Sequence, residues 1–432
     1  MSAWTDSGFG LDHVLYVALA LYFLARYLDF RYDWSQRFEW FHYVHLLYFC
    51  IVLCAAAELM WFVGGIIEVI TAEGGNHEEF RTIGLLMTCI LSITPIALVA
   101  TLAHGLRQSN RHIAEVRRGV GVLKHDRVLQ IICLPPVYGT LALCALVELF
   151  HQVVHQLGED HKGVAYARYD TCILAAELYQ AWALYQLGSL VFDVLQETLS
   201  STGGAPRQGQ QRAGRRESSK DVVVMFTAMS SLAWLGIWIF VIISVIQAVY
   251  SVFLWIGHDP AKDWGTYEAA MQKFSYGGLL AAGAAVYNLT TIGKVFGPVL
   301  EDFNPRPKFY VLMAIVTVTF VQLKVLLLIS SARLWLLPSI KVKNWEISST
   351  IEAKMLHTAL LIFECLACSL VNTWAWDPGE KWFEDEQDAG GLEDAGASAR
   401  ERRPLLRGTS GGGATGAGAR GAAAARRGAL ST

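Results

Sequence analysis

Residues 128–150 read VLQIICLPPVYGTLALCALVELF, and the only charged side chain among these 23 residues is Glu148. A helix of about 20 apolar residues is long enough to cross the hydrocarbon layer of a bilayer. In that layer every backbone polar group must be bonded internally, so a long apolar run is expected to form a helix. The stretch therefore predicts one membrane-spanning helix.

Similar apolar runs lie on both sides of this stretch. They cover residues 11–28, 43–70, 84–105, 169–195, 222–256, 270–298, 309–336 and 356–376. Together with 128–150, these runs predict an all-α, polytopic membrane helix bundle of about nine transmembrane helices.

The composition supports a membrane protein and excludes two large classes of function. Of 432 residues, 53% are hydrophobic and only 17% are charged, which is too apolar for an ordinary soluble enzyme. The net charge of -3 argues against a nucleic-acid binder, because such proteins present clustered basic side chains to phosphates. The expected partners are membrane lipids and a small organic solute.

Lys and Arg in the connections between runs predict the orientation. They are more abundant in every second connection, and basic connections stay in the cytoplasm. This places the N-terminus outside or in a lumen and the C-terminus in the cytoplasm. Residues 201–220 are expected to be a flexible cytoplasmic loop and 379–432 a disordered cytoplasmic tail, because both are rich in Gly and charged residues.

Three segments resemble the alpha subunit of the organic solute transporter and its relatives, the transmembrane protein 184 group. The first joins Tyr169-Asp170-Thr171 to residues 177–186, and the second runs from Phe303-Asn304-Pro305 to Gln322. The third combines Leu134-Pro135-Pro136-Val137-Tyr138, which is similar to a Pro-x-Tyr motif of the family, with Glu364 in the last apolar run. The residues that match the family motifs are Asp170, Gln186, Pro305, Lys308, Phe309 and Gln322. The resemblance implies a seven-helix core at 71–378, preceded by an extra two-helix unit at 1–70.

The resemblance also implies a function. It suggests a transporter that moves organic solutes, with amphipathic or steroid-like organic anions as substrates, by facilitated diffusion. Animal members resemble a two-component system, so a single-span partner subunit is one expectation and a homo-oligomer is another. The alternative is a seven-helix receptor-like or scaffold protein without transport activity, although the sequence lacks the Asp-Arg-Tyr and Asn-Pro-x-x-Tyr elements of common receptors.

Charged and aromatic residues inside the apolar runs are the candidates for a substrate pathway. Because charges in hydrocarbon are costly, Glu177 and Glu364 either line a solute or proton pathway or make structural hydrogen bonds. Lys324 either attracts an anionic solute or pairs with a buried carboxylate such as Glu364. The rings of Tyr179, Trp182 and Tyr185 share a helix face and either stack on a flat solute or pack between helices.

The sequence offers no catalytic, cofactor or metal site. It has no Gly-rich phosphate loop, nucleophile elbow or zinc-binding helix motif, so we expect no enzyme activity and no cofactor. His151 and His155 are four residues apart but have no third ligand nearby in the sequence. In the tail, Glu401, Leu405 and Leu406 fit an acidic dileucine sorting signal, so the expected location is the plasma membrane or an endosomal or vacuolar membrane.

Overall fold

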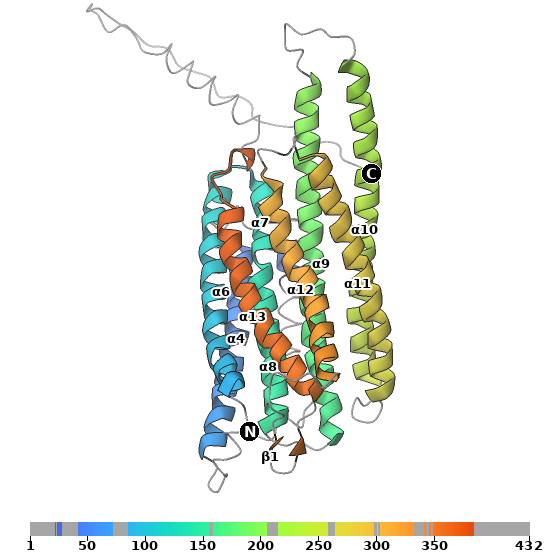
Figure 1. The fold of residues 1–432 in the computed structure, drawn as a ribbon. Coiled ribbons are helices and arrows are strands. Elements are labelled where there is room, and N and C mark those ends of the chain that lie inside the picture. The colour runs from blue at the N-terminus through green and yellow to red at the C-terminus, as the bar shows by residue number, and fades with distance from the viewer. Residues whose placement is uncertain are drawn as a thin grey trace, which may run out of the picture. The chain divides into compact units, whose positions relative to one another are not determined.

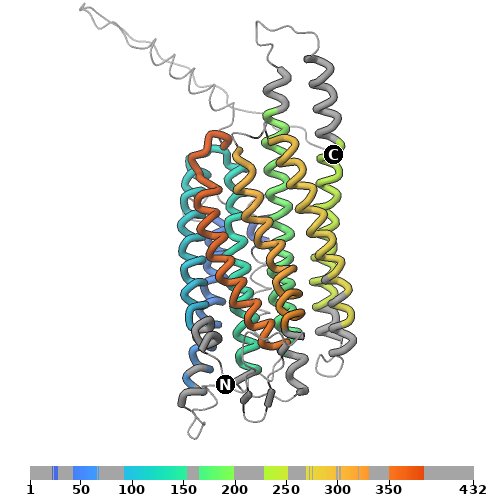
Figure 2. Tube along the Cα trace, in the orientation of Figure 1, coloured from blue at the N-terminus to red at the C-terminus, as the bar shows by residue number. Residues whose placement is uncertain are grey.

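The structure is a computed structural model that describes part of the chain. The described residues are 22, 24–27, 42–71, 85–154, 159–204, 215–257, 264–297, 300, 303–331, 341–342, 345–346 and 349–383. Figure 2 draws the remaining residues in grey. The sorting residues Glu401, Leu405 and Leu406 lie outside the described residues.

The described residues form a bundle of long helices (Figure 1). The helices are α4 (Tyr43–Thr71), α6 (Leu85–Arg118), α7 (Val122–Ile132), α8 (Leu134–Val154), α9 (Glu159–Gly204), α10 (Arg215–Gly257), α11 (Trp264–Val295), α12 (Pro305–Ser331) and α13 (Ser349–Ala375). A two-residue antiparallel pair, β1 (Lys341–Val342) and β2 (Trp345–Glu346), precedes α13, and a short 3-10 helix, η1 (Lys381–Phe383), follows it. The predicted all-α bundle is confirmed.

The helix α8 lies at the centre of the bundle. It packs against α4, α6, α9 and α13, and all its residues from Leu134 to Val147 are buried. By contrast, α10 packs on α9 and α11 and exposes many large apolar side chains, and Figure 1 shows α10 and α11 at one edge of the bundle. A helix that is apolar all round, as α8 is, needs such an enclosed position.

The opening stretch of the sequence contains the break between α7 and α8. Cys133 separates the two helices, and Pro135 and Pro136 follow in the first turn of α8. Proline is tolerated there because the first N–H groups of a helix have no partner within that helix. The amide of Val137 still donates to the Cys133 carbonyl at 3.0 Å, so the chain continues through the break as one long span.

Five segments of the described residues are long and apolar enough to cross a membrane. They are Tyr43–Gly65, Val122–Gln152, Ala228–Ser251, Pro305–Ile329 and Thr350–Ala375. Each overlaps a predicted run, so the chain is an integral membrane protein, while the count of nine helices stays a prediction.

The structure also describes part of the expected loop and tail. Helix α9 extends to Gly204 and α10 begins at Arg215, so residues 205–214 of the expected loop lie outside the described residues. Beyond α13, residues 376–383 form a folded segment that ends in η1. We call residues 376–383 the cap segment.

Candidate functional site

Polar side chains gather where α8, α9, α12 and α13 meet, inside an otherwise apolar bundle. They come from all four helices, and we call them the polar cluster: Tyr138, Tyr169, Glu177, Gln180, Thr319, Gln322, His357 and Glu364. Burial of such groups is costly unless they are bonded to one another or to a ligand.

Helical spacing explains why the cluster forms along one line. His357 and Glu364 are seven residues apart on α13, which is two helical turns. On α9, Asp170 and Glu177 have the same spacing, and on α12, Thr319 and Gln322 lie three residues apart. Each helix therefore directs its polar residues to one face.

Hydrogen bonds between helices hold the cluster together. The Gln322 amide donates to a Glu364 carboxylate oxygen at 2.9 Å, and the Tyr169 hydroxyl lies 2.9 Å from Nδ1 of His357. Tyr138 is within electrostatic range of both Glu177 and Glu364. The four helices thus contribute to one connected site.

Several buried polar atoms in the cluster have no hydrogen-bond partner among the described residues. They are the Tyr138 hydroxyl, both amide atoms of Gln180, Oε1 of Gln322, Oε2 of Glu364 and Nε2 of His357. An unpaired buried polar group destabilises a protein by about 1–3 kcal/mol, so each such group needs an explanation, such as a bound water, an ion or a functional role. The cluster therefore contains both donors and acceptors without a partner among the described residues.

Two cations lie near the carboxylates of the site. Lys354 places its Nζ 3.1 Å from Oδ1 of Asp170, one helical turn before His357. Lys324 is within electrostatic range of Glu177, and its Nζ lies 5.2 Å from the centre of the Tyr276 ring. The carboxylate of Glu364 instead accepts from Gln322.

The aromatic residues of α9 contact protein on both sides of the helix. The Tyr179 hydroxyl donates to the Gln130 carbonyl at 3.1 Å, and the Trp182 indole donates to the Gln130 side chain at 2.8 Å. Trp182 stacks on Tyr185, whose ring also contacts Trp234 and Trp238 of α10. Tyr179 and Trp182 therefore lie toward α7 and Tyr185 lies toward α10.

Gln130 also joins the N-terminal residues to the rest of the bundle. Its amide donates to Asp126 at 3.0 Å and to the Tyr43 hydroxyl at 3.3 Å, while Tyr43 donates to Asp126. Arg26 lies 3.6 Å from Asp126 and 4.9 Å from the centre of the Trp182 ring. We call Arg26, Tyr43, Asp126, Gln130 and Trp182 the N-terminal lock.

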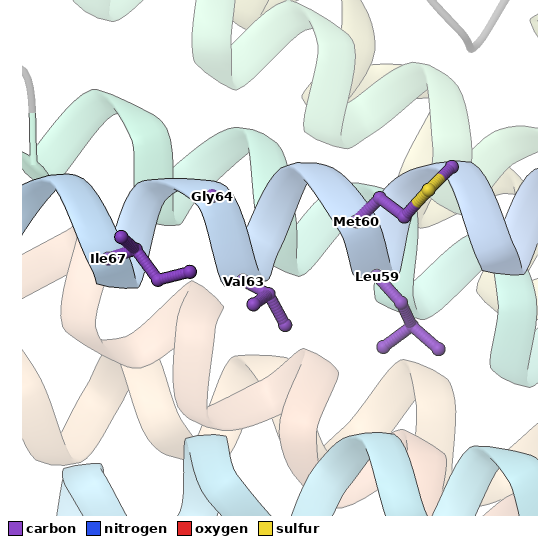
Figure 3. Close-up of a pocket in the computed structure, with 5 residues that line it drawn as sticks. All are labelled: Leu59, Met60, Val63, Gly64 and Ile67. Carbon is purple, nitrogen blue, oxygen red and sulfur yellow. The ribbon is translucent and has the colours of Figure 1, made fainter.

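An apolar hollow lies apart from these polar groups. Figure 3 shows its five lining residues, Leu59, Met60, Val63, Gly64 and Ile67, all on α4. The cavity measures about 380 Å³ and has no titratable side chain in its lining. Nor does any group of three His, Cys, Asp or Glu within the described part of the chain have the geometry to hold a metal ion. The polar cluster is therefore the better candidate for a functional site.

The comparison with known families decides the assignment. The family model described as organic solute transporter Ostalpha matches residues 123–381, more than half of the chain and all of the polar cluster. The chain belongs to the organic solute transporter alpha family. This is a family of membrane transporters rather than a class of enzymes. No curated protein and no solved structure matches the chain significantly.

In this member of the organic solute transporter alpha family, three motif residues lie in the first two turns of α12, and one of them, Lys308, contacts the cap segment. Pro305 begins α12 directly after Asn304, whose φ of 45° turns the chain into the helix. The side chain of Lys308 is fully buried and donates to Oε2 of Glu380 at 2.6 Å and to the Phe303 carbonyl. Phe309, also buried, contacts α11 at Gly293.

Aromatic rings enclose the Lys308 ammonium. Its Nζ lies 4.8 Å from the ring centre of Phe303, 5.3 Å from Trp376 and 5.4 Å from Trp382. A cation over ring faces is attracted by their quadrupoles, more strongly when water is excluded. The motif lysine thus fixes the cap segment to the start of α12.

The cap segment also contacts α6 and α7. Lys124 donates to the Trp382 carbonyl at 3.1 Å and pairs with Glu197 of α9 at 2.8 Å. The rings of His125 and Phe383 stack with centres 3.8 Å apart. Gly121 comes so close that a Cβ there would lie 2.3 Å from the Phe383 carbonyl oxygen.

Two of the remaining motif residues, Asp170 and Gln322, lie in or next to the polar cluster, and Gln186 lies farther along α9. Asp170 pairs with Lys354, Gln322 bonds Glu364, and Gln186 is buried on α9 two turns beyond Tyr179. The sequence did not single out Lys354, His357 or Thr319. The seven-residue spacing of His357 and Glu364 is the signal by which His357 could have been found.

One prediction concerns His112, which lies on α6 beyond its predicted span. Its Nε2 is 3.2 Å from the Trp376 carbonyl and its Nδ1 is 2.9 Å from His125. Burial, with a smaller contribution from His125, lowers the pKa of His112 from 6.5 to about 3. Between these two pH values the folded state thus binds fewer protons than the unfolded state. The contribution of His112 to the free energy of unfolding is therefore fully present above pH 6.5 and is lost as the pH falls toward 3.

At pH 5 this effect corresponds to a loss on the order of 2 kcal/mol. We expect the apparent melting temperature of the protein in detergent to be lower at pH 5 than at pH 7.5. His112→Gln should reduce this difference, because glutamine does not titrate. An equal pH dependence in the wild type and His112→Gln would contradict the assignment.

Proposed function

We propose that this protein carries organic solutes across a membrane, with amphipathic or steroid-like organic anions as its substrates. The observation that carries the proposal is the polar cluster, which lies inside the family-matched region and retains unpaired donors and acceptors. A solute that presents both an acid group and an apolar body matches a polar line enclosed by apolar helices.

Charge balance supports this choice. Lys354 and Lys324 offset Asp170 and Glu177, so the site holds cations next to its carboxylates. The sequence contains no phosphate-binding loop, which favours facilitated diffusion over transport driven by ATP. The proposal assigns the chain no enzyme activity.

The proposal includes an orientation and a location. The N-terminus lies outside or in a lumen and the C-terminus in the cytoplasm, which puts the cap segment at the cytoplasmic end and the start of α13 at the opposite end. The membrane is the plasma membrane or an endosomal or vacuolar membrane. A single-span partner subunit or a second copy of this chain completes the transporter.

Uptake of a radiolabelled steroid sulfate into proteoliposomes tests the proposal. Wild-type protein should equilibrate the label without ATP, and unlabelled steroid sulfate inside the vesicles should speed its entry by exchange. Glu177→Gln should slow uptake at least about tenfold, because it leaves Lys324 without its carboxylate and replaces one acceptor oxygen of the cluster by an amide donor. Glu115→Gln on α6 is the matched control, since its carboxylate pairs with Arg118 away from the cluster.

Two results would contradict the proposal. Uptake no faster than in protein-free liposomes, by protein that is monodisperse in detergent, would favour the receptor-like or scaffold alternative. Equal reductions of the uptake rate in Glu177→Gln and Glu115→Gln would show that transport does not depend on the polar cluster.

A further inference from the structure

The ion pair between Lys354 and Asp170 joins α13 to α9 at one end of the polar cluster. The Lys354 side chain is only 11% exposed and that of Asp170 is 25% exposed, so the cation is the more enclosed member. Tyr169, the residue before Asp170, bonds His357, one turn after Lys354. Two consecutive residues of α9 therefore bind two residues on one face of α13. The ion pair between Lys354 and Asp170 lies at the end of the polar cluster.

Aromatic rings form two walls around the Lys354 ammonium. Its Nζ lies 4.3 Å from the ring centre of Tyr169 and 4.7 Å from that of Tyr166. Two ring faces and the Asp170 carboxylate thus lie close to the cation. This arrangement matches an anion whose acid group is attached to a flat apolar body, because rings stabilise both the cation and the body.

The position of the pair suggests which end of the pathway it serves. Helices α9 and α13 both begin near it, at the end of the bundle where Figure 1 shows β1, and α12 ends there. Lys324, the other cation, faces Tyr276 of α11 and already balances Glu177. Lys354 is therefore the better placed cation for an anion that enters from this end.

We propose that Lys354 is the residue that recognises the acid group of the solute. In the absence of solute, the Asp170 carboxylate occupies the position of that acid group beside Lys354. The sulfate or carboxylate of the solute replaces the Asp170 carboxylate as the counter-ion of Lys354, and its ring system lies against Tyr166 and Tyr169. No covalent bond changes, and each state keeps the lysine paired. This inference rests on the proposed function, because it names a specificity-determining residue for the same solutes.

The two members of the pair should then have opposite effects on binding. Lys354→Gln should weaken equilibrium binding of a tritiated steroid sulfate to the detergent-solubilised full chain by about ten- to a hundredfold, the range for loss of a charge-assisted hydrogen bond. Asp170→Asn should tighten binding by about three- to tenfold, because it removes the internal competitor. If the ion pair only stabilised the structure, loss of either member would instead weaken binding in both variants.

Three controls sharpen the comparison. Lys354→Arg keeps the charge and should retain most of the affinity. Arg168→Gln disrupts a neighbouring ion pair, with Glu148 at 3.1 Å, and should leave the affinity within about twofold of the wild type. The unsulfated parent steroid should bind wild type and Lys354→Gln equally. If Lys354→Gln does not fold, tightening by Asp170→Asn still tests the proposal.

The binding assay separates this inference from the proposed function. If Lys354→Gln binds steroid sulfate more weakly and Asp170→Asn binds it more tightly, but the wild type shows no uptake in proteoliposomes, the results would support the role of Lys354 in binding and contradict transport. A different result would support transport but overturn the role of Lys354: the wild type takes up steroid sulfate, yet Lys354→Gln binds it as tightly as the wild type does, or Asp170→Asn binds it more weakly. Absence of steroid sulfate binding to the wild type would overturn both.

Discussion

Replacing Lys308 by methionine is expected to lower the free energy of unfolding by about 3 kcal/mol. Methionine keeps much of the volume of lysine but removes the ammonium that bonds Glu380 at 2.6 Å and lies over three aromatic rings. Removal of one partner from a buried ion pair destabilises proteins by about 3–5 kcal/mol. The lower end of this range applies because the Glu380 side chain is 22% exposed and keeps some hydration.

The measurement is a denaturant titration of the purified protein in mixed micelles. Lys381→Met is the matched control, because Lys381 lies in the same cap segment but is exposed, and it should change stability little. The double variant Lys308→Met with Glu380→Leu should recover part of the loss, since no charge then stays buried alone. Equal stabilities of Lys308→Met and Lys381→Met would refute a role for the ion pair.

Lys308 also shows what the sequence could not reveal. The motif around it is local and can be recognised from consecutive residues, but its partner Glu380 lies 72 residues away. The same holds for Asp170, whose partner Lys354 is 184 residues away. The motif residues could be found from the family resemblance, while their contacts depend on how distant helices pack.

The helices themselves could be predicted more easily from the sequence, because hydropathy, which identifies a membrane span, is a local property of the chain. The run at 128–150 predicted the central helix, although the proline pair divides it at Cys133 into α7 and α8. The last run was predicted to begin at residue 356, whereas α13 begins at Ser349. Hydropathy places Lys354 in a connection because it scores a lysine as exposed and cannot see that Asp170 neutralises it.

The pathway residues show a similar limit. The sequence placed Glu177, Lys324 and Glu364 inside apolar runs, and Lys324 and Glu364 lie within segments that could cross a membrane, but the choice of partners needed coordinates. Gln322, singled out only as a motif residue, is the group that bonds Glu364. Short polar side chains such as Thr319 carry no signal in a hydropathy pattern, so the full cluster could not be read from the chain.

The second large effect is expected at Gln130, the centre of the N-terminal lock. Its side chain is fully buried, accepts from Trp182 at 2.8 Å and donates to Asp126 at 3.0 Å. Gln130→Leu has a similar size but leaves the indole N–H and one carboxylate oxygen with fewer partners. At about 1–3 kcal/mol for each lost partner, we expect a destabilisation of about 3 kcal/mol that is concentrated where α4 meets α7.

Thiol labelling gives a local readout of this loss. Cys133 is fully buried beside Tyr48 and Tyr179, so it should react with a maleimide only when the N-terminal residues separate from the bundle. We expect Gln130→Leu to raise the labelling rate of Cys133 at least about tenfold, measured by peptide mass spectrometry with the buried Cys365 as internal reference. The exposed Gln196→Leu is the control and should leave both rates unchanged. If Cys133 and Cys365 accelerate equally in Gln130→Leu, the loss is global, and Gln130 does not specifically hold the N-terminal residues against the family core.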